Sequence, residues 1–154
     1  FFFTSSFICV MITVTDSEPL LRLQIGGEYM FIRLYDDDPR DLYVQLADEI
    51  VRLMAEGALE DGEELPSIRS LASTLQVNVK TVQASYQKLA DEGYITQRKK
   101  ARAIIDRSRF DREAWEARWR ERLRQFQHEC RATGQSERDT LERLFNDLQE
   151  EESL

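Results

Sequence analysis

Seven basic side chains gather in one stretch of an otherwise acidic sequence, and phosphate binding is the chemistry that such a group can do. Residues 66–102 carry seven lysines and arginines against two acids, a net charge of +5, whereas the 154-residue chain has a net charge of −8. A local basic surface attracts nucleic acid, because lysine and arginine neutralise phosphates and release counterions. The sequence therefore predicts one surface for a polyanion within an acidic protein.

Three predicted helices and a two-stranded ribbon must position these charges. Apolar residues recur at spacings of three and four over residues 42–57, 67–75 and 78–92, which is the period of an amphipathic helix. Two short β-prone pieces, residues 94–96 and 103–105, follow with a cationic run between them, and they indicate a hairpin. This order of elements is typical of a winged helix-turn-helix domain.

The third predicted helix has a polar face of the kind that enters a major groove. Lys80, Gln83, Ala84 and Gln87 lie at positions i, i+3, i+4 and i+7, opposite an apolar stripe that contains Tyr86. Lysine can meet the acceptor atoms of guanine and glutamine can pair with adenine, whereas a small alanine permits close approach. A merely solvated helix face has the same composition, so this pattern alone leaves both interpretations open.

A longer set of spaced residues extends over half of the chain. Its members are Gly57, Leu59, Gly62, Leu65, Pro66, Ser67, Arg69, Leu71, Ala72, Val77, Asn78, Thr81, Val82, Tyr86, Leu89, Gly93 and Ile95. From about Met30 to Asp106, this pattern resembles the GntR-type bacterial transcription regulators and, within that family, the YtrA-like subfamily. Residues 109–150 are similar in pattern and length to the two-helix tail of the same subfamily.

The resemblance implies a DNA-binding surface that spans the second and third helices and the wing. It makes Arg69 the leading contact outside the third helix, while Ser67 and Asn78 are also good helix N-caps. The wing departs from the family, because Lys100 and Arg102 stand where two glycines are usual, which indicates a looser loop that contacts phosphate through side chains. The predicted DNA-binding residues are Ser67, Arg69, Asn78, Lys80, Thr81, Gln83, Gln87, Lys99, Lys100 and Arg102.

Residues 107–154 are predicted to form a helical hairpin that dimerises two copies. Two short helices with apolar stripes cannot bury both faces in so small a unit, and tryptophan is enriched at protein interfaces. Gly134 marks the turn between the helices, and Ser136 caps the second one. Folding of this tail onto its own winged domain is the alternative. The predicted dimerisation residues are Trp115, Trp119, Leu123, Phe126, Leu141, Leu144, Phe145 and Leu148.

The sequence lacks the groups that most catalytic or metal sites need. One histidine, His128, and two cysteines, Cys9 and Cys130, offer neither a zinc-ligand pattern nor a nucleophile paired with a base. We therefore expect no enzyme activity, no cofactor and no metal. The few cysteines suit a reducing cytoplasm, and no apolar run approaches the roughly 20 residues needed to cross a bilayer.

Together these patterns predict a mainly α fold with a small β-wing. A winged helix-turn-helix domain is expected at residues 30–106, followed by the dimerising hairpin at residues 107–154. Residues 1–29, of which the first fifteen are uncharged, are expected to form a poorly ordered N-terminal extension. A strand that adds to the main body is the alternative for that segment.

The predicted function is binding of double-stranded DNA by a homodimer at a palindromic operator, as a transcriptional regulator and repressor. The rival interpretation is a protein-interaction module whose winged fold does not bind DNA. For Lys99 and Lys100 themselves, the alternative to phosphate contact is a solubilised hairpin tip. The tail is too short to enclose a metabolite pocket of about 300 Å³, and an effector site between domains or at a dimer interface stays open.

Overall fold

The computed structural model describes residues 20–25, 28–35, 37–97 and 102–151, and within these ranges the side chains from Met30 to Glu150. The chain divides into two compact units, Phe1–Phe110 and Asp111–Leu154. The division falls after Phe110 rather than after the predicted Asp106, because the intervening segment packs onto the first unit. There the backbone N–H of Arg107 donates to an Asp61 carboxylate oxygen across 2.7 Å.

The first unit opens with an antiparallel hairpin of β1 (Leu20–Ile25) and β2 (Glu28–Arg33), in which Leu20 pairs with Arg33 and Ile25 with Glu28. β1 lies within residues 1–29, for which the sequence predicts a poorly ordered extension with an added strand as the alternative. Residues 1–19 lie outside the described residues.

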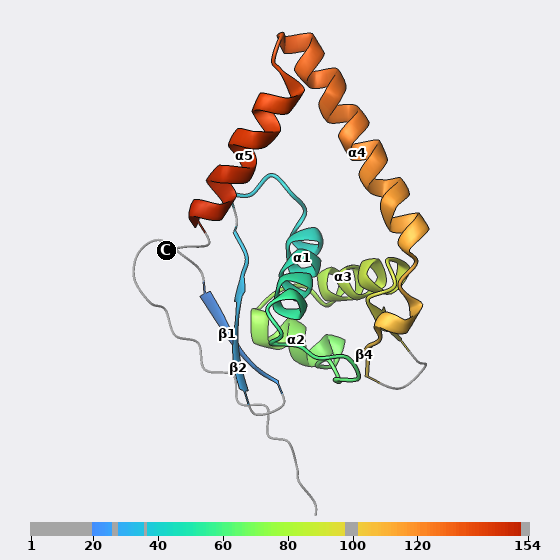
Figure 1. Cartoon of the computed structure of the whole chain (residues 1–154). Coiled ribbons are helices and arrows are strands. Elements are labelled where there is room, and N and C mark those ends of the chain that lie inside the picture. Colours follow the sequence, from blue (N-terminus) through green and yellow to red (C-terminus); the bar gives the residue numbers. More distant parts are fainter. Residues whose placement is uncertain (1–19, 26–27, 36, 98–101, 152–154) are drawn as a thin grey trace, which may run out of the picture. The chain divides into compact units, whose positions relative to one another are not determined.

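Three helices follow the hairpin, as the apolar periodicity predicted (Figure 1). They are α1 (Leu42–Ala55), α2 (Ile68–Leu75) and α3 (Val79–Asp91). Both predicted N-caps are confirmed. The Ser67 hydroxyl accepts from the backbone N–H of Ser70 at 3.1 Å, and the Asn78 side-chain carbonyl accepts from the N–H of Lys80 at 2.8 Å. These caps satisfy N–H groups that a helix start leaves without partners.

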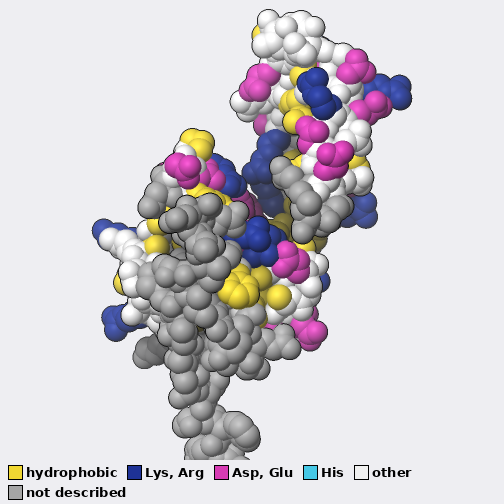
Figure 2. Space-filling view, turned by 90° about the vertical axis from the view of Figure 1, so that its left-hand side faces the viewer, with side chains coloured by type: hydrophobic (Ala, Val, Ile, Leu, Met, Phe, Trp, Pro, Cys, Tyr) yellow, Lys and Arg dark blue, Asp and Glu magenta, His cyan; other side chains and the backbone are white. Residues whose placement is uncertain are grey.

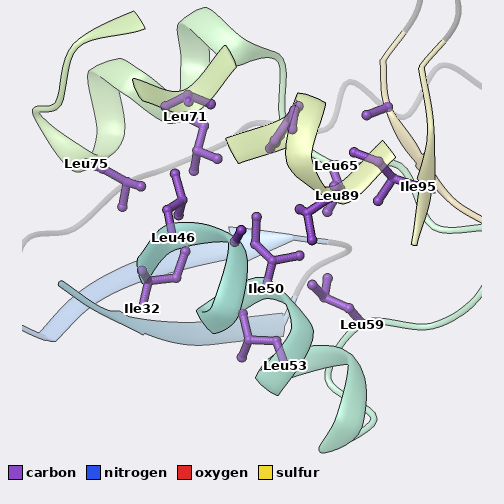
Figure 3. Packing of buried hydrophobic residues seen from close by; sticks show 14 of the residues in the cluster. Ile32, Leu46, Ile50, Leu53, Leu59, Leu65, Leu71, Leu75, Leu89 and Ile95 are labelled. Atoms are coloured by element: carbon purple, nitrogen blue, oxygen red, sulfur yellow. The ribbon is translucent and has the colours of Figure 1, made fainter. Parts of the chain in front are cut away.

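The core of the first unit joins the hairpin to all three helices. Ile32 of β2 lies beside Leu46 of α1, and side chains of α2 and α3 close the other side (Figure 3). Met30 and Ile32 of β2 and Leu34 just after it are buried, whereas Phe31 and Arg33 are exposed, so this segment alternates in the manner of a half-buried strand. This core fixes α3 against α1 and α2 and leaves the opposite face of α3 to solvent.

The wing consists of β3 (Ile95–Thr96) and β4 (Ile104–Ile105), which pair antiparallel as predicted. The segment before α2 adds a third backbone to this ribbon. The backbone N–H of Leu65 donates to the carbonyl oxygen of Ala103 at 2.8 Å, and the N–H of Ile105 donates to the carbonyl oxygen of Glu63 at 2.9 Å. Residues 98–101, the predicted wing tip, lie outside the described residues. The base of the wing is therefore tied directly to the start of the helix-turn-helix.

The second unit is a pair of helices, α4 (Arg112–Thr133) and α5 (Glu137–Glu151). Gly134 ends α4 with a φ of +69°, a left-handed conformation that suits glycine. Ser136 caps α5, since its hydroxyl accepts from the N–H of Asp139 at 3.3 Å. The mainly α fold with a small β-wing and a helical tail is confirmed, and the β1–β2 hairpin is added to it.

Candidate nucleic-acid interface

The start of α2 and the middle of α3 are joined by a buried hydrogen bond. The phenolic O–H of Tyr86 donates to the carbonyl oxygen of Pro66 across 2.9 Å. Tyr86 is 1% exposed, and its burial raises the pKa of the phenol. The prediction that Tyr86 packs in the core is confirmed. This bond holds the N-terminal turn of α2 at a set distance from α3.

The outer face of α3 carries the side chains predicted to read bases. Lys80, Gln83 and Gln87 are exposed, while Thr81 and Ala84 are partly buried. The inner face of the helix buries Val82, Ser85, Tyr86 and Leu89. The helix therefore has a polar outer face about one turn from its N-cap, which is the part that enters a major groove in helix-turn-helix proteins.

The charge on α3 is unevenly distributed along its length. Near the C-terminal end, Lys88 forms an ion pair with Glu92 at 2.5 Å, and the Gln87 amide donates to Asp91 at 2.8 Å. In both interactions, the basic or amide side chain at this end of α3 is paired with an acid four residues further along the chain. The exposed Lys80 lies in the first turn, where the helix dipole also has its positive end. An anion is therefore attracted to the N-terminal half of α3.

The N-caps Ser67 and Asn78 are exposed beside this surface. Capping uses the acceptor oxygens of these side chains. A phosphate needs donors, which the serine hydroxyl and the asparagine NH₂ group also supply. Capping and phosphate contact are therefore compatible at both residues. Arg69 is exposed in the first turn of α2, one residue after its start.

Arg102 is the described member of the cationic wing residues. It is exposed and lies 3.5 Å from a carboxylate oxygen of Glu64, a long contact between two solvated groups. Lys99 and Lys100 lie outside the described residues. At the base of the wing, Thr96 donates to Asp106 at 2.7 Å. Hydrogen bonds from Ser108, and then from Thr96, lower the pKa of the Asp106 carboxyl. This carboxylate therefore stays ionised at neutral pH.

The predicted dimerisation residues lie along α4 and α5 and are largely open to solvent. Trp119 is 43% exposed and Phe145 is 62% exposed, while Trp115 and Phe126 are partly buried. The Trp115 and Trp119 rings meet edge to face at 6.1 Å. The upper part of Figure 2, where α4 and α5 lie, shows hydrophobic side chains among acidic and basic ones. Leu123, Leu141, Leu144 and Leu148 are likewise between 45% and 59% exposed.

Sequence reasoning missed two features that shape this surface. The pairing of residues 63–65 with the wing is signalled only weakly, because Glu-Glu-Leu has low strand propensity. The Tyr86–Pro66 bond joins residues twenty positions apart, which no local pattern reveals. No group of three His, Cys, Asp or Glu side chains among the described residues is placed to hold a metal. Within the same ranges, no helix has the length and apolarity to span a bilayer.

Three helices with a β-ribbon after the third define a winged helix-turn-helix domain, here followed by a helical pair. The family model described as bacterial regulatory proteins, gntR family, matches residues 42–105. The chain belongs to the GntR family, as its resemblance to GntR regulators predicted. The matched range begins at the first residue of α1 and ends at the last residue of β4.

Comparison with individual proteins agrees with this assignment. The chain is 42% identical over 65 residues to the HTH-type pyridoxine biosynthesis transcriptional regulator PdxR of Corynebacterium glutamicum, covering 42% of this chain and 14% of that protein. It is 36% identical over 61 residues to the HTH-type transcriptional repressor YtrA of Bacillus subtilis, and this match covers 38% of this chain and 47% of that protein. The chain thus spans less than half the length of either of these curated relatives.

A solved structure matches over a longer range. YtrA from Sulfolobus acidocaldarius, described as a GntR-family transcription factor, is 37% identical, with a TM-score of 0.53. The match covers 66% of this chain and 97% of that one. The similarity therefore extends over nearly the whole of that structure.

Proposed function

We propose that the protein is a sequence-specific DNA-binding transcriptional regulator that represses by occupying its operator. The observation that carries this proposal is the exposed outer face of α3, with Lys80 and Gln83 near its start, on a helix held by α2 in a GntR-family domain. GntR-family membership also supports the expectation that the protein is not an enzyme. A repressor bound to a chromosomal operator would act in the cytoplasm.

In the proposed complex, α3 enters the major groove. Lys80 and Gln83 contact base edges, while Thr81 lies beside Lys80 and Gln87 lies about one turn beyond Gln83 on the same face. Ser67, Arg69 and Asn78 contact phosphates from the helix starts and thereby fix the register of the protein on the duplex. Arg102, with Lys99 and Lys100, contacts phosphates that flank the groove. The supporting argument is that all the described members of this set are exposed or partly exposed on one domain.

The tail is the proposed dimer interface, and the dimer places two copies of α3 on a palindromic site. Large apolar side chains of α5, Leu141, Leu144, Phe145 and Leu148, are about half or more exposed. Burying them against a second copy removes apolar surface from water and stabilises the dimer. In a symmetric dimer the half-sites then lie about 10 base pairs apart or somewhat more.

Binding of the full chain to duplex DNA across a salt series tests the proposal. Selection from random duplexes should yield a palindrome, and the affinity for it should fall steeply with salt, with a log–log slope of roughly −0.9 per phosphate neutralised. The acidic net charge and the apolar tail also suit a protein-interaction module. That alternative predicts a folded protein that retains no duplex even at low salt.

A further inference from the structure

A cavity of about 320 Å³ lies in the first unit, away from the outer face of α3. Three elements form its walls: the end of α1, the turn between α3 and β3, and the segment that follows β4. Apart from Arg107, the lining residues that the structure describes are aliphatic, aromatic or glycine. They include Val51, Met54, Tyr94 and Phe110. The volume is at the lower end of the range of small-molecule sites, about 300–1,000 Å³.

The wall after β4 is held in place by close contacts, so the cavity is formed without a ligand. A Cβ at Gly93 would lie 2.7 Å from the carbonyl oxygen of Arg109, which shows how closely the two segments approach. The rings of Tyr94 and Phe110 are 6.0 Å apart between centroids. The N–H of Arg107 is held by Asp61. A preformed cavity costs a ligand little ordering free energy.

Arg107 places a positive charge at the edge of this apolar cavity. One guanidinium nitrogen donates to the carbonyl oxygen of Met54 at 3.2 Å, near the C-terminus of α1. That bond fixes the side chain and uses one of its five N–H groups. The lining residues within the described part of the chain include no acid. The site therefore combines an apolar body with a cation that can donate to an anionic head group.

We propose that this cavity binds a small aromatic or branched aliphatic carboxylate. Its apolar body packs between Met54, Tyr94 and Phe110, and its carboxylate accepts hydrogen bonds from Arg107. Such a ligand would contact Arg107 and Phe110, in the last part of the first unit before the tail begins. The proposal does not depend on the DNA-binding role, because no lining residue belongs to the proposed DNA-binding set.

Three probes of equal size and different charge test the site in the full-length protein. The probes are 1-naphthoate, the neutral 1-naphthalenemethanol and the cationic 1-naphthylmethylamine, and calorimetry or saturation-transfer NMR measures their affinity. Naphthoate should bind saturably and about tenfold more tightly than the alcohol, because a charge-assisted hydrogen bond is stronger than a neutral one. The amine should bind most weakly. Equal affinities, or no saturable binding of naphthoate, would overturn the proposal.

Two variants locate the binding. Arg107→Gln should reduce the affinity for naphthoate about tenfold, to the level of the alcohol, and leave the alcohol unaffected. Ala55→Leu extends an exposed lining side chain into the cavity and should weaken both probes. The matched controls are Arg109→Gln, a neighbouring arginine outside this cavity, and Ala117→Leu on α4. If a control weakens naphthoate as much as Arg107→Gln does, the probe binds elsewhere and the assignment is wrong. Thermal melting confirms that each variant is folded.

Discussion

Tyr86 and Pro66 are joined by a buried 2.9 Å hydrogen bond from the phenol to the backbone carbonyl oxygen. Tyr86 lies on the inner face of α3, and Pro66 directly precedes the N-cap of α2. One side chain therefore connects the helix proposed to read bases with the helix start proposed to hold phosphate. Any loss of this bond leaves a buried carbonyl oxygen without its donor.

The first prediction concerns stability. Tyr86→Phe should lower the free energy of unfolding by about 1–3 kcal/mol, because it leaves the Pro66 carbonyl unsatisfied while keeping the ring. Urea denaturation measures the change. Tyr94→Phe is the control, since its ring contact with Phe110 needs no hydroxyl. Equal stability of the two variants would show that the buried bond contributes nothing.

The second prediction concerns alkaline pH. Burial raises the pKa of Tyr86 above the value of about 10 that it has in the unfolded chain. Above pH 10 the unfolded state loses a proton that the folded state keeps, so the free energy of unfolding falls by up to about 1.4 kcal/mol per pH unit. Tyr86→Phe lacks this dependence. The difference in the free energy of unfolding between the wild type and Tyr86→Phe should therefore narrow from pH 9 to pH 11. A constant difference over this range would contradict the prediction.

The third prediction compares two glycines with similar backbone conformations. Gly93 has φ +80° and Gly57 has φ +75°, but only at Gly93 would a Cβ meet other atoms, 2.7 Å from the carbonyl oxygen of Arg109. Gly57→Ala should cost about 1 kcal/mol for left-handed strain alone. Gly93→Ala should cost clearly more, because backbone atoms must also move. Thermal unfolding of the pair measures the excess, and equal losses would argue against the close approach.

Much of this fold follows from local patterns, and what does not follow depends on contacts distant in sequence. The helices were predictable because their apolar residues repeat with the helical period and their starts carry Ser67 and Asn78. The strand at 20–25 also has a local signal, since polar and apolar residues alternate there before a Gly-Gly pair, which is common in hairpins. The uncharged first fifteen residues mostly lack such alternation, so the segment as a whole does not indicate a strand.

The candidate site was predictable only in part. The spacing of Lys80, Gln83 and Gln87 places them on one helix face, because that relation is local. The i, i+4 spacing of Lys88 and Glu92 likewise indicates their ion pair, because residues four apart are neighbours on a helix. The cavity beside Arg107 could not be predicted, because its walls are far apart in sequence and meet through tertiary contacts such as the close approach at Gly93.

The fourth prediction separates phosphate contact from base reading. Arg69→Ala should weaken binding to all duplexes alike and reduce the salt slope by about 0.9, because one phosphate contact is lost. Gln83→Ala should relax the preference at one base pair of each half-site, at a cost of about 1–3 kcal/mol of discrimination. Arg143→Ala on α5 is the control for loss of an exposed arginine. An unchanged consensus for Gln83→Ala would show that the helix is wrongly placed in the groove.

The fifth prediction concerns the tail. Trp119→Ala should raise the dimer dissociation constant by about tenfold or more, because a large apolar anchor is removed from the proposed interface. Light scattering across a dilution series measures it. His128→Ala changes another exposed residue of α4 and should leave the mass unchanged. A Trp119→Ala variant that stays wholly dimeric at every concentration would exclude a central role for this side chain.

In the proposed dimer, the anchoring of residues 107–110 would determine where the molecule can adapt to operators of different half-site spacing. These residues are fixed by Asp61, by the Met54 carbonyl and by the glycine against which they lie. Rotation between the proposed DNA-binding domain and the proposed dimerisation tail must therefore occur about the backbone bonds that begin at Asp111. Lengthening the chain by one residue at that point should change the tolerated half-site separation without altering the bases that each half prefers.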